Sequence, residues 1–264
     1  MDSSSHHDAS ASPLAGRTAI VTGASRGIGR AISLHLASLG ANLVLNYSSS
    51  SAQADLLASQ INPPSPAPPR AITVRADVSV AADVKTLFDR AEEVFGKMPH
   101  IIVNNAGVLD AKYPTIEATL EADWDAAFSV NAKGTFLSCQ EAAKRLARGG
   151  GGRIINVSSS LVGLNAPGYG AYTASKAAVE ALTKILAKEL KGTGITANCI
   201  APGPIATELF YAGKSEDDVK RIVGMIPMGR LGETTDVAPA VGFLATDAAE
   251  WINGQVIRVN GGVV

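Results

Sequence analysis

A tyrosine and a lysine stand four positions apart in the segment Tyr172-Thr173-Ala174-Ser175-Lys176. On a helix, two side chains at this spacing share one face and lie about 6 Å apart. A lysine cation beside a phenol favours the phenolate and lowers the pKa of the tyrosine from about 10, which suits proton transfer near neutral pH. The pair indicates a general acid or base, although the same spacing also occurs in many ordinary helices.

Three consecutive serines, Ser158–Ser160, follow a predicted strand. Parallel strands bring their carboxyl ends to the crevice in which open α/β sheets bind ligands, and a serine there can donate to a substrate oxygen. Each of these serines can equally be a cap or turn residue.

A glycine-rich loop, TGASRGIG at 22–29, lies between the first predicted strand and the first predicted helix. Glycines allow positive φ and let the backbone approach a diphosphate, and a helix N-terminus offers free N–H groups to the anion. The spacing G-x-x-x-G-x-G departs from the generic G-x-G-x-x-G fingerprint. Its position after the first strand favours a dinucleotide site, and the alternative is a simple tight turn.

The residues after the second predicted strand bear on the choice of dinucleotide. An acid there would accept the 2′-hydroxyl of NAD, whereas a 2′-phosphate needs a cation. The strand ends in Asn46-Tyr47-Ser48-Ser49, and the next acid, Asp55, is already inside a predicted helix. Arg26 in the glycine loop can bind a phosphate through its planar guanidinium, unless it is only a solvated loop residue. NADP(H) is the predicted cofactor.

Strands and helices alternate along the chain and must position these residues. The predicted strands are Thr18–Thr22, Asn42–Tyr47, Ala71–Ala76, Ile101–Asn104, Arg153–Val157, Ile195–Ile200 and Val256–Val259. The predicted helices are Ile28–Leu39, Ser51–Ile61, Ala81–Phe95, Ala122–Leu146, Tyr172–Leu190 and Thr235–Thr246. Strands rich in Val and Ile predict a sheet covered on both faces, and the alternation predicts right-handed crossovers. We expect an α/β fold: a single Rossmann-type, doubly wound domain at 16–264 with about seven parallel strands, after a flexible arm at 1–15.

Composition excludes several classes of protein. Of the 264 residues, 46% are hydrophobic and 18% are charged, which is enough to build a packed core. The net charge of −1 argues against a nucleic-acid or membrane-surface binder. No apolar run approaches the ~18 residues that span a bilayer, and no residues show the spacing of metal ligands. Two cysteines and no targeting signal predict a reducing, cytoplasmic location.

Seven ordered motifs resemble those of the short-chain dehydrogenase/reductase superfamily, in its branch of compact single-domain enzymes. The motifs are TGASRGIG at 22–29, Asp77-Val78, NNAG at 104–107, Asn131, NVSSS at 156–160, YTASK at 172–176 and PGPIAT at 202–207. The resemblance covers the chain from about residue 17 to its end. Within the superfamily, the sequence is more narrowly similar to aldehyde reductase-like members known from plants.

The resemblance implies four catalytic roles. Tyr172 resembles the general acid that protonates a carbonyl oxygen, and Lys176 the lysine that lowers the tyrosine pKa and holds the nicotinamide ribose. Asn131 is similar to the asparagine that positions a relay water, although it can instead cap backbone groups inside a helix. Ser159 resembles the serine that orients the substrate, with Ser160 as a one-residue alternative.

The resemblance also implies contacts to NADP(H) along the whole cofactor. The implied contact residues are Gly23, Ser25, Arg26, Ile28, Tyr47, Ser48, Asp77, Val78, Asn104, Ala106, Gly107, Tyr172, Lys176, Pro202, Gly203, Ile205 and Thr207. The NNAG segment can also serve only to stabilise the central sheet, and Pro202-Gly203 can be only a turn.

The substrate pocket is predicted from the segments beside these motifs. Its expected lining is apolar: Leu161, Val162, Leu164, Leu209, Phe210 and Tyr211. No arginine or lysine is clearly placed to hold a substrate carboxylate, which favours neutral aldehydes or ketones. Residues 208–232 are expected to form a mobile lid. The family implies a homotetramer or homodimer joined through the helices at about 122–146 and 172–190.

The predicted activity is NADPH-dependent reduction of a neutral aldehyde or ketone to an alcohol, with Tyr172 as proton donor. A small-molecule carbonyl or alcohol is therefore the expected partner, with no nucleic acid and no membrane. The alternatives are an NADP-dependent alcohol dehydrogenase working oxidatively and a 3-oxoacyl thioester reductase. A Rossmann-like methyltransferase and a catalytically idle NADPH-binding regulator fit less well, because Tyr172 and Lys176 are both present.

Overall fold

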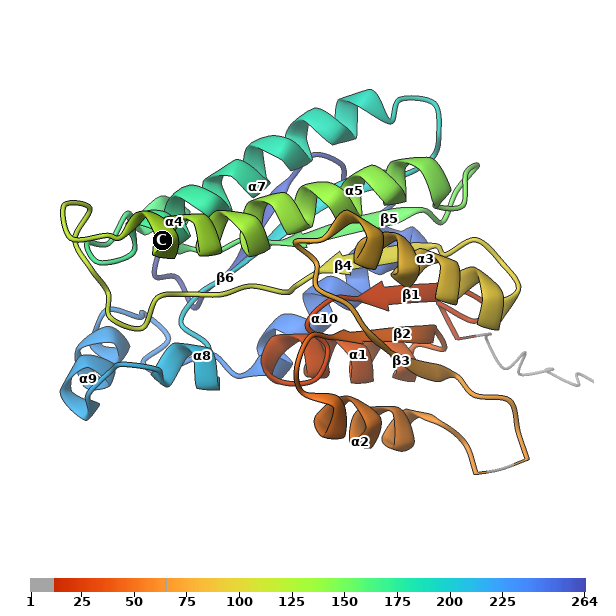
Figure 1. Cartoon of the computed structure of the whole chain (residues 1–264), viewed down its shortest axis with the longest axis horizontal. Coiled ribbons are helices and arrows are strands. Elements are labelled where there is room, and N and C mark those ends of the chain that lie inside the picture. The colour runs from red at the N-terminus through yellow and green to blue at the C-terminus, as the bar shows by residue number, and fades with distance from the viewer. Residues whose placement is uncertain (1–11, 65) are drawn as a thin grey trace, which may run out of the picture.

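The parallel sheet has seven strands in the order β3-β2-β1-β4-β5-β6-β7 (Figure 1). The computed structural model describes residues 12–64 and 66–264, so most of the predicted arm at 1–15 lies outside the described residues. The strands are β1 (Thr18–Val21), β2 (Asn42–Tyr47), β3 (Ala71–Arg75), β4 (Ile101–Asn104), β5 (Arg153–Val157), β6 (Thr196–Pro202) and β7 (Val256–Val259). Every strand pairing is parallel, which confirms the predicted doubly wound sheet.

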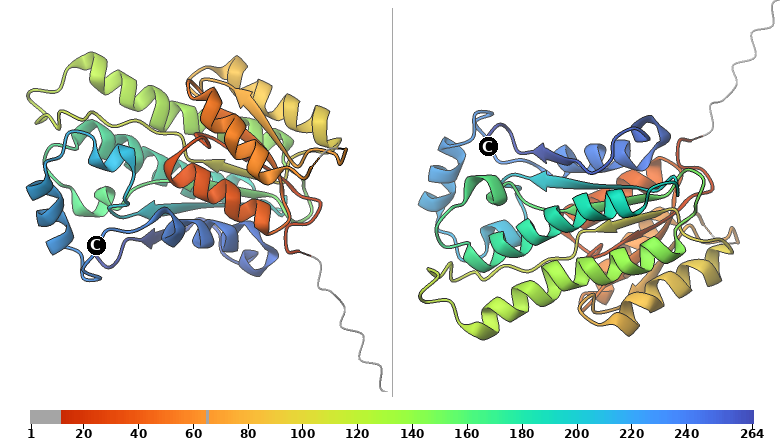
Figure 2. Two further views of the ribbon diagram at one scale, coloured as in Figure 1. Left: turned by 90° about the horizontal axis from the view of Figure 1, so that it is seen from below. Right: turned by 90° about the horizontal axis from the view of Figure 1, so that it is seen from above.

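Helices cover both faces of the sheet. The longer ones are α1 (Gly27–Ser38), α2 (Ser51–Ile61), α3 (Ala81–Phe95), α5 (Gly134–Arg145), α7 (Gly170–Glu189) and α10 (Thr234–Ala245). One core cluster joins α1, α2 and α10 to one face, and the other joins α3, α5 and α7 to the opposite face. Figure 2 shows α5 and α7 in green and teal on one side and α1 and α10 in red and blue on the other.

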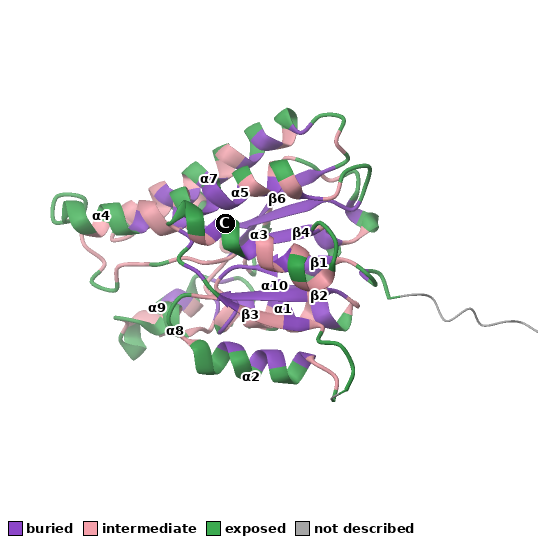
Figure 3. Ribbon diagram, turned by 45° about the vertical axis from the view of Figure 1, so that its right-hand side comes forward, coloured by how far each residue is buried: buried purple, intermediate pink, exposed green. Residues whose placement is uncertain are grey.

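The strands are largely apolar because both faces of the sheet are covered. In β1, Val21 belongs to the core beneath α1, whereas its neighbour Ile20 belongs to the core beneath α3. Successive side chains of a strand point to opposite faces, so both positions need an apolar residue. The central strands β1, β4, β5 and β6 are accordingly buried at every position, whereas the edge strands β3 and β7 are partly exposed. Green, exposed positions lie mainly on the outer faces of the helices (Figure 3).

The predicted helix at 122–146 is not a single α-helix. It comprises α4 (Glu121–Ala127), a π-helical segment η1 (Phe128–Lys133) and α5. Extra-residue π-turns are rare inside helices and frequent at functional sites, and here the segment contains Asn131. Periodicity could not reveal this insertion, since a single π-turn leaves the apolar pattern on either side helical.

Four short elements fall outside the predicted set: α6 (Leu161–Leu164), α8 (Glu208–Tyr211), α9 (Glu216–Gly224) and the 3₁₀ turn η2 (Asp247–Ala249). The predicted lid at 208–232 therefore contains two helices. A capping box between Ser215 and Asp218 begins α9, because each side chain binds the backbone N–H of the other residue.

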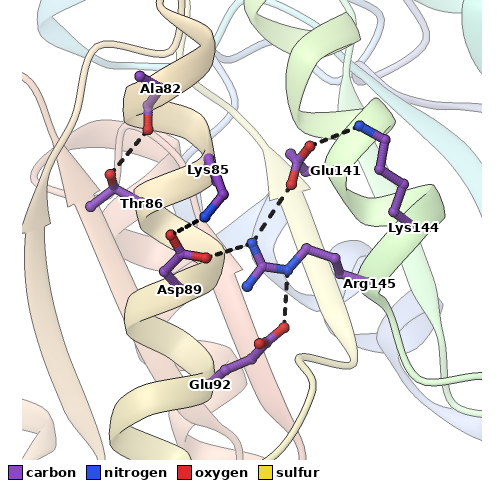
Figure 4. A network of polar contacts seen from close by, with 8 residues as sticks. All are labelled: Ala82, Lys85, Thr86, Asp89, Glu92, Glu141, Lys144 and Arg145. Carbon is purple, nitrogen blue, oxygen red and sulfur yellow. Dashed lines mark hydrogen bonds and ion pairs between the residues drawn. The ribbon is translucent and has the colours of Figure 1, made fainter.

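An arginine-centred network ties α5 to α3 far along the sheet from the glycine loop. Arg145 lies 2.8 Å from Asp89 and 3.0 Å from Glu92, both on α3, and 3.6 Å from Glu141 on its own helix (Figure 4). Its guanidinium also lies 5.6 Å from the centre of the Phe88 ring. The network holds together the two helices that cover β4 and β1 on this face.

Candidate active site

A large cleft runs along the carboxyl ends of the strands and has a volume of about 1530 Å³. This edge of an open parallel sheet is where ligands of doubly wound folds bind. The predicted site residues that line it are Gly23, Ser25, Arg26, Ile28, Tyr47, Ser48, Asp77, Val78, Ala106, Gly107, Ser159, Tyr172, Lys176, Pro202, Gly203, Ile205 and Thr207. Asn104 and Asn131 are the two predicted residues that are not part of its lining.

The glycine loop has the backbone geometry that its sequence predicts. Gly23 and Gly27 have φ of +61° and +54°, values that residues other than glycine rarely adopt. A Cβ on Gly29 would lie 2.2 Å from the Gly23 carbonyl oxygen, so no side chain fits there. Helix α1 begins at Gly27 with no acid in its first turn and no side-chain cap at Arg26, which leaves its N–H groups to an anion.

The end of β2 fits a dinucleotide with a 2′-phosphate. Tyr47 and Ser48 line the cleft there, and no carboxylate occupies the position that would bind a 2′-hydroxyl. Arg26 also lines the cleft, and its guanidinium lies 3.0 Å from the Glu208 carboxylate at the start of α8. Both side chains are more than half exposed, so the ion pair is weak and a phosphate can displace the carboxylate.

Tyr172 and Lys176 share the cleft-facing side of α7, as their spacing predicts. Lys176 Nζ donates to the Val157 carbonyl over 2.7 Å and lies 5.8 Å from the centre of the Tyr172 ring. Burial raises the pKa of Tyr172 to about 12 and lowers the pKa of Lys176 to about 8. Desolvation is the main cause of both shifts in the protein without cofactor, and the lowering of the tyrosine pKa by Lys176 stays a prediction.

The three serines after β5 have different partners. Ser158 Oγ donates to Glu180 over 2.7 Å, and Ser160 Oγ donates to the Ala201 carbonyl over 3.1 Å. Ser159 Oγ accepts from the Leu161 N–H over 3.2 Å. The Ser159 hydroxyl is also close enough to lower the pKa of Tyr172, against the effect of burial. Ser159 is thus the serine whose hydroxyl lies beside Tyr172 in the cleft.

Asn131 lies behind the cleft in η1 and is fully buried. Its amide oxygen accepts from the Val108 N–H over 2.8 Å, and its amide nitrogen donates to the Val108 carbonyl and to Ser175 Oγ, each over 3.0 Å. These contacts use both amide hydrogens, so the side chain cannot donate to a relay water. It holds the loop after β4 against α7, next to Lys176.

Asn104 does not reach the cleft, because its side chain points into the sheet layer. Its amide nitrogen donates to Asn156 Oδ1 over 2.8 Å and joins β4 to β5. The next residue, Asn105, lines the cleft instead and donates to the carbonyls of Thr22 and Gly23 over 3.0 and 3.1 Å. Asn105 was not predicted, although the doubled asparagine of NNAG offers it one position further on.

The substrate end of the cleft is apolar on several sides but contains two cations. Leu161, Leu164, Leu209 and Phe210 line it as predicted, together with Tyr169 and Met225, whereas Val162 and Tyr211 do not. Lys214 and Arg221 also line it, so the predicted pocket without a lysine or arginine is incorrect. Lys214 follows α8 and Arg221 lies in α9, in a segment whose fold the sequence did not reveal.

Across the described ranges 12–64 and 66–264, no helix is both long and apolar enough to cross a membrane, and no three His, Cys, Asp or Glu side chains gather as metal ligands.

The fold and the cleft together define a dinucleotide-binding α/β protein with a Ser-Tyr-Lys cluster at the cleft's centre. Residues 23–264 match the family described as Enoyl-(Acyl carrier protein) reductase. The chain belongs to the short-chain dehydrogenase/reductase family, whose members are oxidoreductases.

Similar proteins cover almost the whole chain. A "Short-chain type dehydrogenase/reductase" of Picea abies is 60% identical over 95% of this chain and 93% of its own. The "NADPH-dependent aldehyde reductase-like protein, chloroplastic" of Arabidopsis thaliana is 59% identical over 96% of both chains. The crystal structure of the angucycline C-6 ketoreductase LanV with bound NADP superposes with a TM-score of 0.86, at 35% identity over 95% of this chain and 96% of its own.

Proposed function

We propose that the protein reduces the carbonyl group of a neutral aldehyde or ketone to an alcohol, using NADPH and Tyr172 as proton donor. The observation that carries the proposal is the meeting of Ser159 and Tyr172 in the cleft that the glycine loop and Lys176 also line. Relatives at 59% and 55% identity named as NADPH-dependent aldehyde reductases support the cofactor and the reaction.

The residues along the cleft divide the binding of the cofactor among them. The glycine loop and the N-terminus of α1 would bind the diphosphate, and Arg26 with Ser48 would bind the 2′-phosphate. The loop from Pro202 to Thr207 would flank the nicotinamide, and Lys176 would donate to its ribose. When bound, NADPH supplies the hydride that forms the new C–H bond and is oxidised to NADP⁺.

The chain's own residues handle the oxygen of the substrate. Ser159 and Tyr172 would donate hydrogen bonds to the carbonyl oxygen, where negative charge develops as the C=O double bond is reduced. Tyr172 then transfers its proton to that oxygen. A pKa of about 12 in the protein alone keeps the phenol protonated at neutral pH, as a proton donor requires.

The proposal is tested by following cofactor consumption with NADPH and with NADH against neutral aldehydes and ketones. We expect turnover with NADPH and much weaker turnover with NADH. A preference for NADH would contradict the role of Arg26 and Ser48 while leaving the chemistry of Tyr172 intact. Tight NADPH binding without turnover of any carbonyl would favour a regulatory protein instead. The same residues serve alcohol oxidation, so the assay is also run in reverse with NADP⁺.

A 3-oxoacyl thioester is a second candidate substrate class. It is favoured by a 38% identical "3-oxoacyl-[acyl-carrier-protein] reductase" of Staphylococcus aureus, which aligns over 94% of this chain. A 3-oxoacyl thioester in the same assay decides between the two classes, because only this second candidate predicts that it is the better substrate.

We further propose that the protein forms a homotetramer, with a homodimer as the simpler alternative. Phe136 on α5 and Ile185 on α7 leave 45% and 54% of their surfaces exposed, which supports burial of these helices against a second copy. A cytoplasmic location and the absence of nucleic-acid and membrane partners remain predictions. Two Arabidopsis relatives carry the word "chloroplastic" in their names.

A further inference from the structure

Lys214 lies among three aromatic rings at the substrate end of the cleft. Its Nζ is 4.2 Å from the centre of the Tyr113 ring, 4.9 Å from that of Phe210 and 5.7 Å from that of Tyr169. The rings come from the loop after β4, from α8 and from the residue before α7. Aromatic faces attract a cation, so this position stabilises a charge that has left bulk water.

Two of the three donors of the Lys214 ammonium have partners in the chain. Nζ donates to the Phe210 carbonyl over 2.7 Å and to the Tyr113 hydroxyl. The Tyr113 hydroxyl in turn donates to the Ala212 carbonyl over 2.6 Å, so its own proton is also used. An ammonium has three donors, which leaves one N–H of Lys214 without an acceptor in the part of the chain that the structure describes.

Lys214 has no carboxylate partner within 4.0 Å among the described residues, and this distinguishes it from Arg221, the other cation at the substrate end of the cleft. Arg221 lines the same end but lies 3.0 Å from Asp218 and is mostly exposed. Lys214 is half-buried, and desolvation lowers its pKa. A partly buried charge with a free donor is stabilised by an added oxygen acceptor.

The positions of Tyr172 and Lys214 indicate the direction in which a bound ligand would extend along the cleft. Tyr169 lies three residues before Tyr172, affects the pKa of Tyr172 and forms one wall around Lys214. Apolar side chains line the cleft around them, namely Leu161, Leu164, Leu209 and Met225. A molecule whose carbonyl contacts Tyr172 would extend past Tyr169 along this apolar wall toward Lys214.

We propose that Lys214 is a second recognition point for the substrate and binds an oxygen acceptor remote from the reacting carbonyl. The substrate class is thus a carbonyl compound with an apolar middle and a hydroxyl, second carbonyl or carboxylate oxygen at its far end. The inference rests on the proposed function, because it takes the reacting carbonyl to lie at Tyr172. The alternative is a structural role, in which Lys214 only joins the segment after α8 to the loop after β4.

The test uses linear aldehydes of graded length, each in forms that end in a methyl, a hydroxyl or a carboxylate group. We expect the wild-type enzyme to prefer an oxygen-ended aldehyde of one length over its methyl-ended partner, and the hydroxyl and carboxylate forms tell a neutral from an anionic acceptor. Lys214→Met should lower kcat/KM for the oxygen-ended aldehyde about 10- to 100-fold and leave the methyl-ended one within about threefold. Lys214→Arg should restore part of the preference.

Tyr113→Phe is the matched control, because it removes the hydroxyl that fastens Lys214 but keeps the ring and the ammonium. We expect this variant to retain the preference for the oxygen-ended aldehyde. Equal losses with methyl- and oxygen-ended aldehydes in Lys214→Met would show a mechanical fastener and overturn the proposal, as would a wild-type enzyme without preference.

A binding measurement separates failure of this proposal from failure of the proposed reduction. Alcohols, diols and the corresponding hydroxy acids of the same lengths are titrated by calorimetry into the wild-type and Lys214→Met proteins in the presence of NADP⁺, which needs no turnover. Tighter binding of a diol or hydroxy acid to the wild-type protein alone would support the site even if no aldehyde were reduced. Equal binding of the alcohols, the diols and the corresponding hydroxy acids would overturn it even if aldehydes were reduced.

Discussion

Lys176 Nζ lies 5.8 Å from the centre of the Tyr172 ring, one turn further along α7, and donates to the Val157 carbonyl instead. Burial raises the pKa of the Tyr172 phenol and so favours its protonated form. The buried lysine is destabilised as a cation by the same desolvation. The centre of the site is thus built for proton donation at a cost in stability.

Because burial destabilises the Lys176 cation, we predict that Lys176→Met stabilises the protein without cofactor. Burial lowers the lysine pKa from 10.5 to about 8 in the folded state, so at pH 7 the wild-type protein carries an unfavourable buried charge. Replacing it should raise the free energy of unfolding by about 1–3 kcal/mol, after the lost hydrogen bond to Val157 is counted. Urea denaturation at pH 7 measures the difference.

The pH dependence of the stability difference between Lys176→Met and wild type independently tests whether desolvation of the lysine causes it. Between pH 8 and 10.5 the folded wild-type protein releases the Lys176 proton while the unfolded chain keeps it, so wild-type stability rises. The advantage of Lys176→Met should therefore shrink over this range. Lys184→Met, on the exposed side of the same helix, should show no such trend. A variant less stable than wild type at pH 7 would show that the hydrogen bond outweighs desolvation.

Arg26 should decide the preference between the two cofactors. Arg26→Ala is expected to weaken NADPH binding about 10- to 100-fold and NADH binding by no more than about threefold, because only NADPH carries the 2′-phosphate. Glu208→Gln removes the carboxylate that lies 3.0 Å from Arg26 and should strengthen NADPH binding about two- to fivefold. Fluorescence titration measures both. Equal losses of NADPH and NADH in Arg26→Ala would contradict the assignment.

The network of Figure 4 should contribute to stability and not to activity. Arg145→Met removes contacts to Asp89, Glu92 and Glu141, and we expect a loss of about 1–2 kcal/mol after allowing for solvent screening of the two partly exposed acids on α3. Thermal unfolding measures the loss, and about 1 M salt should reduce it. Arg148→Met, which replaces a nearby exposed arginine, is the control. An unchanged melting temperature in Arg145→Met would show that the network contributes nothing.

The sheet and the cofactor half of the cleft could be predicted from the sequence because local rules determine them. Buried parallel strands need continuous apolar runs, and the positive φ at Gly23 and Gly27 needs glycine. Five of the six predicted helices also agree with the structure to within about two residues, whereas the segment at 122–146 contains a π-turn that leaves no periodic signal.

The substrate half could not be predicted in the same way. Lys214, which follows α8, contacts Tyr113 from the loop after β4. The two residues are far apart in the sequence, and no spacing of residues predicts such a contact. The orientation of neighbouring residues was equally hidden. Asn104 and Asn105 are adjacent in one motif, yet only the second lines the cleft, because the first is the last residue of β4 and points into the sheet layer.

The most direct test of the account is the turnover of Tyr172→Phe with NADPH and an aldehyde that the wild-type enzyme reduces, measured together with NADPH binding. The substitution removes one hydroxyl and its proton. We predict that kcat falls about 10²- to 10⁴-fold while the Kd for NADPH stays within about threefold, and that Tyr211→Phe, outside the cleft lining, behaves as wild type. Wild-type turnover in Tyr172→Phe would contradict the central claim, and so would a loss of NADPH binding equal to the loss of activity.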